Sequence, residues 1–157
     1  MNLSPLIALA VSAVPAAAQC SWSSISVTSY GQGCSPLGGG AGLLLGASLD
    51  VTACRLDLDV TAAPGCCGGA FVGSVLALGF SPVSTPAPVL GPGCTLLASP
   101  GILIYATGAA ASTFQLQFLA ASLPPTTFYV QVASLSFSPT GPGPVWAASA
   151  GARLDLH

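Results

Sequence analysis

Charge is what this sequence has least of. Its 157 residues include neither Lys nor Glu, and 4% of them are charged, against about 25% in an ordinary globular protein. Nucleic-acid binding depends on clustered Lys and Arg side chains that neutralise phosphates, and this chain has two Arg residues in all. The composition therefore excludes a basic nucleic-acid interface. A hydrophobic content of 52% also excludes the polar, highly charged composition of disordered chains.

Groups that could carry out catalysis are equally scarce. The single histidine, His157, is the last residue, and chain ends commonly fray. No G-x-S-x-G turn accompanies it to support a Ser–His–Asp triad. Paired carboxylates for glycoside cleavage could come only from Asp50, Asp57, Asp59 and Asp155. We therefore expect a protein that is not an enzyme and that binds no cofactor.

The N-terminal residues have the pattern of a secretory signal peptide. Residues 6–14 are a short apolar run, and residues 15–18 (P-A-A-A) supply a small-residue cleavage motif. We expect residues 1–18 to be removed and residues 19–157 to form the mature domain, which is secreted, extracellular or held at the cell surface. A buried N-terminal helix and a lipid anchor on Cys20 are the alternatives. The mature chain has no apolar run of the roughly 18 residues that a membrane span needs.

Six cysteines follow the predicted cleavage site, and an even number in an exported chain indicates disulfides. They are Cys20, Cys34, Cys54, Cys66, Cys67 and Cys94. A zinc site is the alternative, but Cys66 and Cys67 are adjacent rather than spaced as C-x-x-C, and no His lies near them. Because adjacent cysteines rarely bond to each other, we expect these two to have different partners.

Alternating apolar and polar residues predict two strands within residues 113–137, separated by Pro124 and Pro125. Successive side chains of a strand point to opposite faces, so one set should be buried and the other solvated. The residues that we expect in the core, including two from an earlier apolar stretch, are Leu76, Leu78, Phe114, Leu116, Phe118, Val130 and Val132. The residues that we expect to be more exposed are Gln115, Gln117 and Gln131.

Further short strands are expected over residues 22–29, 70–80, 95–99, 102–107, 145–148 and 152–156. The almost wholly apolar stretch 70–80 should be buried on both faces, and the proline-rich stretch 81–93 should be an irregular crossover. Within residues 43–60 the apolar phase flips near Cys54, which indicates either two strands meeting at a tight turn or one long strand with a bulge. Eight or nine short strands predict an all-β fold, a single antiparallel β-sandwich of Ig-like or jelly-roll-like type.

The one cluster of charge lies in the same region. Arg55, Asp57 and Asp59 share the solvent face of a predicted strand, and Asp50 is close in sequence. A weak calcium site, an ion-pair patch and a solvated strand face are the possible interpretations. Calcium usually takes six to eight oxygen ligands, so the solvated face is favoured.

Four short segments carry a resemblance to a known family. They are Y-G-Q-G-C at residues 30–34, G-C-T-L-L at 93–97, Y-V-Q at 129–131 and A-S-x-G-x-x-L at 148–154. In this combination the chain resembles small, exported, uncharacterised bacterial β-sandwich modules over residues 30–156. The resemblance implies a secreted β-sandwich with a bridge between Cys34 and Cys94, and it implies no activity. Given that bridge, we expect Cys20 and Cys54 to share Cys66 and Cys67 as partners.

Three non-catalytic classes of function follow. The favoured one is an extracellular structural module that associates with copies of itself, because few charges are present to keep molecules apart. The second is a carbohydrate-binding or other adhesive module that contacts extracellular polysaccharide, with sugars stacking on Trp22, Tyr105, Tyr129 or Trp146. The third is a stable domain whose partner is another protein, for example at the cell surface.

Overall fold

Regular structure in this protein is almost entirely β-strand. The computed structural model describes residues 20–35, 43–62, 71–108, 112–117, 124–137 and 144–157. These residues form eleven strands and one short 3-10 helix, η1 (Pro88–Leu90), and no α-helix. No helix within these ranges is long and apolar enough to cross a membrane. The predicted all-β class is confirmed, with more strands than the eight or nine expected, whereas the predicted signal peptide lies outside the described residues.

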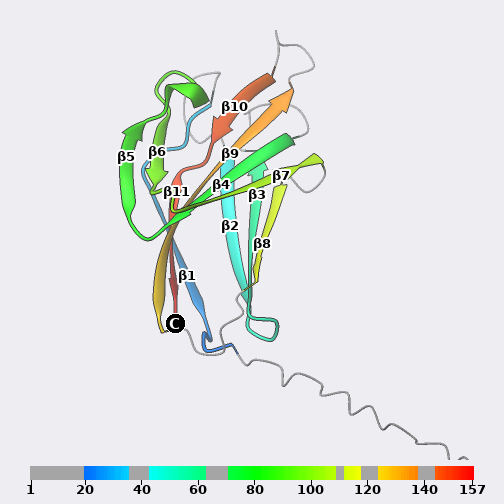
Figure 1. The fold of residues 1–157 in the computed structure, drawn as a ribbon, viewed down its shortest axis with the longest axis vertical. Helices are drawn as coiled ribbons and strands as arrows, with labels where there is room; N and C mark the ends of the chain where they lie inside the picture. Colours follow the sequence, from blue (N-terminus) through cyan, green and yellow to red (C-terminus); the bar gives the residue numbers. More distant parts are fainter. Residues whose placement is uncertain (1–19, 36–42, 63–70, 109–111, 118–123, 138–143) are drawn as a thin grey trace, which may run out of the picture.

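Six antiparallel strands form the large sheet (Figure 1). In spatial order its strands are β1 (Ile25–Tyr30), β11 (Gly151–Leu156), β9 (Thr126–Phe137), β4 (Phe71–Gly79) and β7 (Ile102–Thr107), with β10 (Pro144–Ala148) beside β9. The long strand β9 pairs with β11 along its first half and with β10 along its second half. On its other side β9 pairs with β4. As a result β9 and β4 are central, whereas β1 and β7 lie at the edges.

Three strands form the small sheet, in the order β2 (Leu43–Asp50), β3 (Arg55–Ala62) and β8 (Thr113–Gln117). The first two are a hairpin in which Asp50 is paired with Arg55. The Asp50 carboxylate closes the turn, because Oδ1 accepts hydrogen bonds from the backbone N–H groups of Thr52 and Ala53, both at 3.0 Å. Of the two readings of the phase flip near Cys54, the tight turn is therefore the right one.

The two sheets face each other (Figure 1). Buried residues of both sheets form one hydrophobic core cluster between them. The large sheet contributes Leu76 and Leu78 from β4 and Val130 and Val132 from β9, all buried, and β8 contributes Phe114. All five burials were predicted, those of Phe114, Val130 and Val132 from strand alternation and those of Leu76 and Leu78 from the apolar stretch 70–80. Leu116 is partly buried against them. Phe118 lies outside the described residues.

A third layer covers part of the outer face of the large sheet. It consists of β5 (Pro82–Pro86), η1 and β6 (Thr95–Ala98), which together connect β4 to β7. The expectation of an irregular crossover over residues 81–93 was therefore wrong. Pro82 and Pro86 occupy the two ends of β5, and its pairing with β6 is interrupted between Pro82 and Thr85. An edge strand with irregular pairing tolerates residues that lack a backbone N–H.

This third layer explains the second wrong expectation, that Gln131 would be exposed. Its side chain points away from the core, as the alternation requires, but β6 covers it and only 3% of it is accessible. The amide Oε1 accepts a hydrogen bond from the backbone N–H of Leu97 (2.8 Å), and Nε2 donates to the carbonyl oxygens of Thr95 (3.0 Å) and Ser149 (3.1 Å). Gln131 thus joins the third layer to the large sheet. On β4, the burial of Ala77 on this outer face agrees with the prediction of a strand covered on both sides.

Candidate functional site

The charged residues form local ion pairs rather than a ligand cage. Arg55 Nε lies 2.9 Å from Asp57 Oδ1, and Arg55 Nη2 lies 3.6 Å from Asp50 Oδ2. The hydrogen bond with Asp57 raises the pKa of Arg55 further above its ordinary value. Asp59 instead accepts a hydrogen bond from the Thr113 hydroxyl at 3.3 Å. Within the described ranges no three His, Cys, Asp or Glu side chains gather as metal ligands, so the ion-pair interpretation fits these contacts better than a calcium site.

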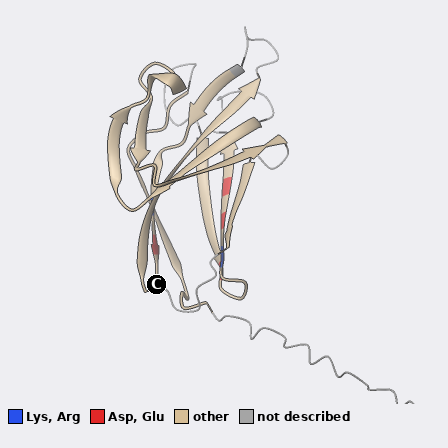
Figure 2. Cartoon of the chain, viewed as in Figure 1, with Lys and Arg blue, Asp and Glu red and all other residues tan. Residues whose placement is uncertain are grey.

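The second charged group lies on β11, in the lower part of the molecule as drawn (Figure 2). Arg153 Nη2 lies 2.9 Å from Asp155 Oδ1, which also accepts a hydrogen bond from the Thr127 hydroxyl at 2.6 Å. The Thr127 hydrogen bond is the largest cause of the lowered pKa of Asp155, and Arg153 adds to it. A carboxylate held in this way is a poor general base, because its proton affinity is reduced.

His157 is fixed by its backbone and not by its ring. Its N–H donates to the Ser24 carbonyl oxygen at 3.1 Å, and its own carbonyl oxygen accepts from the hydroxyl of Ser23 at 3.2 Å. The Ser23 hydroxyl therefore faces the backbone of His157 and not the imidazole. Asp155, the nearest acid in sequence, is already engaged by Thr127 and Arg153. The described residues do not bring a Ser–His–Asp arrangement together.

The segments that carry the family resemblance have structural roles in this fold. Tyr30 Oη donates a hydrogen bond to the Leu97 carbonyl oxygen at 2.6 Å. The pKa of Tyr30 is raised, mainly by partial burial and to a smaller extent by the neighbouring Tyr129. Gly31 has φ +63°, and a Cβ there would lie 2.8 Å from Leu97. The backbone of Cys34 exchanges two hydrogen bonds of 2.9 Å with Ala148. These contacts attach the end of β1 and the residues that follow it to the third layer and to the last residue of β10.

Two disulfides are present among the described cysteines. Cys34 is bonded to Cys94 with a Cα–Cα distance of 5.3 Å, which is the pairing that the resemblance implies. Cys20 is bonded to Cys54 at 4.8 Å, so the expected sharing of these two with Cys66 and Cys67 was wrong. The reason is the β2–β3 turn, which carries Cys54 to the segment before β1. Such disulfides are typical of extracellular proteins, while Cys66 and Cys67 lie outside the described residues.

The four described aromatic side chains proposed for sugar stacking do not pair as a flat platform. Trp22 is buried in the core, where its ring meets Phe128 edge-on at 84°. Tyr129 packs edge-on against Tyr30 at 82°. Tyr105 is exposed, but it is not paired with another ring in the described part of the chain. Of the four residues proposed for sugar stacking, Trp22 borders one hollow and Trp146 lines a second cavity.

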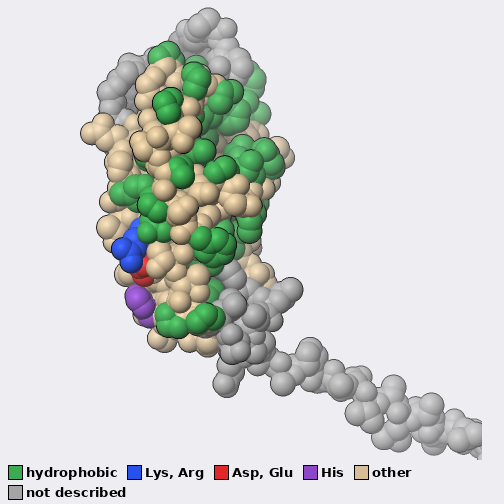
Figure 3. All heavy atoms as spheres, turned by 60° about the vertical axis from the view of Figure 1, so that its left-hand side comes forward, with side chains coloured by type: hydrophobic (Ala, Val, Ile, Leu, Met, Phe, Trp, Pro, Cys, Tyr) green, Lys and Arg blue, Asp and Glu red, His purple; other side chains and the backbone are tan. Residues whose placement is uncertain are grey.

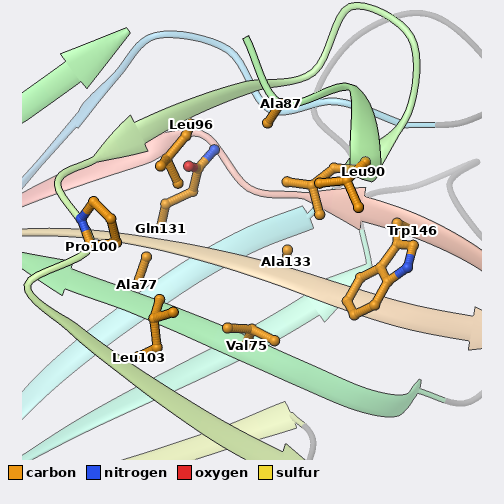
Figure 4. Close-up of a pocket in the computed structure, with 11 residues that line it drawn as sticks. Val75, Ala77, Ala87, Leu90, Leu96, Pro100, Leu103, Gln131, Ala133 and Trp146 are labelled. Atoms are coloured by element: carbon orange, nitrogen blue, oxygen red, sulfur yellow. The ribbon is translucent and has the colours of Figure 1, made fainter. Parts of the chain in front are cut away.

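That cavity, here called the outer pocket, lies between the outer face of the large sheet and the third layer (Figure 4). It has a volume of about 320 Å³. Val75, Ala77 and Ala133 form its floor, Leu96 faces them from β6, and Trp146 lies at one end. The remaining lining residues are Ala87, Val89, Leu90, Pro100, Leu103 and Gln131. The outer pocket could not be predicted, because residues 81–93 were not expected to form a layer.

The edge strand β7 is a further feature that the sequence did not reveal. Its residues Ile102, Leu103 and Tyr105 are 52%, 46% and 69% exposed. A run of apolar residues such as I-L-I-Y-A normally indicates a buried central strand, but β7 pairs only with β4 among the described strands. Hydrophobic side chains are also spread over the face in Figure 3, where the charged atoms and the single His form one small patch.

No known protein family matches this chain, and no curated protein or solved structure is significantly similar to it. Function is therefore inferred from the chemistry of the described residues. Among the described residues, the features left without a structural role include the exposed apolar edge formed by β7 and the outer pocket.

Proposed function

We propose that this protein is a non-enzymatic, exported structural module that associates with copies of itself, and that strand β7 is the contact. The observation that carries the proposal is the exposure of three large apolar side chains on an edge strand. Ile102, Leu103 and Tyr105 lie within six consecutive residues that contain no charge. Burying such side chains against a second molecule removes apolar surface from water, which favours association.

The backbone of β7 supports the same interaction. In an antiparallel sheet every second residue of an edge strand directs its N–H and C=O groups away from its single neighbour, where another strand can pair with them. Proteins usually protect such edges with Lys, Pro or a β-bulge. Residues Ile102–Thr107 contain neither Lys nor Pro, and their pairing with β4 runs without a register shift. A second β7 strand, which has the same uncharged composition, is a suitable partner.

The other sheet edges are less suited to this contact. On β8 the exposed side chains include Gln115 and Gln117, which remain well solvated in a monomer. On β1 the one large exposed apolar side chain is Val27, and its neighbours are Ser and Thr. Among the described edge strands, only β7 combines an uncharged, unprotected edge with several exposed large side chains.

The low overall charge removes the main opposition to association. Net charge keeps proteins apart in solution, and this chain has a formal net charge of −2 at pH 7. Both arginines are already paired, Arg55 with Asp57 and Arg153 with Asp155, and β7 itself carries no charged residue. Two molecules can therefore approach through β7 without desolvating an ion, which would otherwise cost energy.

Sedimentation velocity of the purified, oxidised protein at several concentrations up to the high micromolar range tests the proposal. We expect the wild-type protein to shift from monomer to larger species with concentration. Tyr105→Lys should remain monomeric, because a lysine on an edge strand opposes strand pairing. Val27→Lys is the matched control on the opposite edge of the same sheet and should associate like the wild type. A wild-type protein that stays monomeric, or a Tyr105→Lys variant that associates normally, would contradict the proposal.

A further inference from the structure

The outer pocket has a lining that suits only one class of ligand. Ten of its eleven lining residues are apolar, and the eleventh is Gln131. The Gln131 amide already makes three hydrogen bonds, to the backbone of Leu97, Thr95 and Ser149. It therefore has little capacity left for a ligand or for water. None of the six charged side chains of the protein lines this space.

Water is held poorly in such a space. A bound water usually makes two to four hydrogen bonds, and apolar cavities that cannot supply them tend to stay dry. Apolar ligands bind well where the displaced water is badly hydrogen-bonded. The side chains that line an unfilled cavity also lack partners for dispersion contacts. Both effects favour an occupant without charge and with few polar groups.

The volume of the outer pocket limits the size of the occupant. An apolar cavity of roughly 150 Å³ can bind benzene, and the outer pocket is about 320 Å³. It can thus hold a ligand about twice as large as benzene. Ala77 and Ala133 on the floor leave the space open, and the ring of Trp146 bounds one end (Figure 4). A small aromatic ring system or a short hydrocarbon chain fits these limits, and a folded protein surface does not.

We infer that the outer pocket is a binding site for an uncharged apolar small molecule, such as a hydrocarbon chain or a fused aromatic ring. This inference shares one residue with the proposed association, because Leu103 of β7 lines the outer pocket. Ile102 and Tyr105 do not line it, so Tyr105→Lys tests association without altering the outer pocket. A larger hollow of about 580 Å³ lies near Trp22 and Phe80. It is bordered by Gln117 and Pro124, which flank residues outside the described ranges, so its chemistry is not defined by the described residues.

The uncharged fluorescent probe N-phenyl-1-naphthylamine tests the inference, because its emission rises when it enters an apolar site. We expect saturable binding of one probe per chain. The anionic analogue 8-anilinonaphthalene-1-sulfonate should bind at least about tenfold more weakly, because no cationic side chain lines the outer pocket to offset desolvation of the sulfonate. Equal affinity for the two probes would overturn the assignment of an uncharged ligand.

Two variants locate the site. Ala133→Leu places a larger side chain on the floor of the outer pocket and should lower probe affinity at least about tenfold. Its folding is checked by circular dichroism and thermal unfolding. Ala53→Leu adds the same atoms at the β2–β3 turn, which does not line the outer pocket, and should bind like the wild type. A second measurement is the quenching of tryptophan emission by the probe, which should largely disappear in Trp146→Phe although Trp22 remains.

The outcomes separate clearly. Probe binding that is lost in Ala133→Leu and retained in both Ala53→Leu and Tyr105→Lys supports the inference, whether or not the protein associates. Absence of binding overturns it, and so does binding that a well-folded Ala133→Leu variant retains, since the probe would then occupy another site. Binding that falls as the protein concentration rises, at a fixed ratio of probe to protein, would mean that a second copy covers the outer pocket, and this would overturn it as well.

Discussion

Replacing Gln131 by Met would show how much the third layer depends on one buried amide. Methionine has a similar length and is apolar, so the change removes hydrogen bonds with little change in volume. Three hydrogen bonds are lost, those to Leu97 N, Thr95 O and Ser149 O. At a net value of about 0.5–1.5 kcal/mol each, and with buried backbone groups left unpaired, the free energy of unfolding should fall by about 2–5 kcal/mol. Ordinary domains have only about 5–15 kcal/mol in total.

Urea denaturation with a two-state fit would measure this loss, and hydrogen exchange would locate it. The Leu97 amide should exchange faster in Gln131→Met, because its acceptor is gone. Gln115→Met is the matched control: Gln115 is exposed, so this change should cost less than about 0.5 kcal/mol. A loss below about 1 kcal/mol in Gln131→Met, together with an unchanged Leu97 amide, would refute the argument that this side chain holds the third layer in place.

Three further predictions follow from the described contacts. Phe114→Ala should lower the free energy of unfolding by about 3–5 kcal/mol because the side chain is buried between the sheets. Phe137, the exposed last residue of β9, is the control. A similar loss in Phe137→Ala would contradict the assignment of Phe114 to the core. Thr127→Val should raise the pKa of Asp155 towards its ordinary value, measured by carboxyl NMR titration. The lowered pKa of Asp155 stabilises the folded wild-type protein above about pH 4, and this stabilisation is lost as the pH falls below that value. The free energy of unfolding of Thr127→Val should therefore fall less than that of the wild type when the pH is lowered below about 4. Peptide mapping without reduction should recover Cys20 bonded to Cys54, and a peptide joining Cys54 to any other cysteine would show that the described pairing is wrong.

Strand alternation was a good predictor wherever only two layers meet. Phe114 on β8 and Val130 on β9 are buried, and Gln115 is exposed, as the period of two requires. The same rule placed Gln131 correctly on the face opposite Val130. It did not reveal that β6 covers this face, because that contact joins residues distant in sequence. The Gln131 side chain is tolerated beneath β6 because its amide oxygen and its amide nitrogen both have hydrogen-bond partners.

The disulfide framework shows a similar limit. The resemblance implied the bond between Cys34 and Cys94, which the structure contains. The partner of Cys54 could not be chosen from spacing, since six cysteines allow 15 connectivities. It depends on the β2–β3 hairpin, which brings Cys54 near the segment that precedes β1. A long strand with a bulge, the alternative that the sequence left open, would have directed Cys54 elsewhere.

The proposed function depends most on which strand lies at the edge of the large sheet, and composition does not show this. Strands β4 and β7 are both almost wholly apolar, yet β4 has neighbours on both sides and a layer over its outer face, whereas β7 has one neighbour among the described strands. The same residue types therefore form core in one strand and exposed surface in the other. A charged protein would reveal an edge by the lysines that protect it, but this chain contains no Lys. Its lack of charge thus conceals the edge in the sequence, and it leaves β7 in the folded molecule without the lysines that would oppose pairing with another strand.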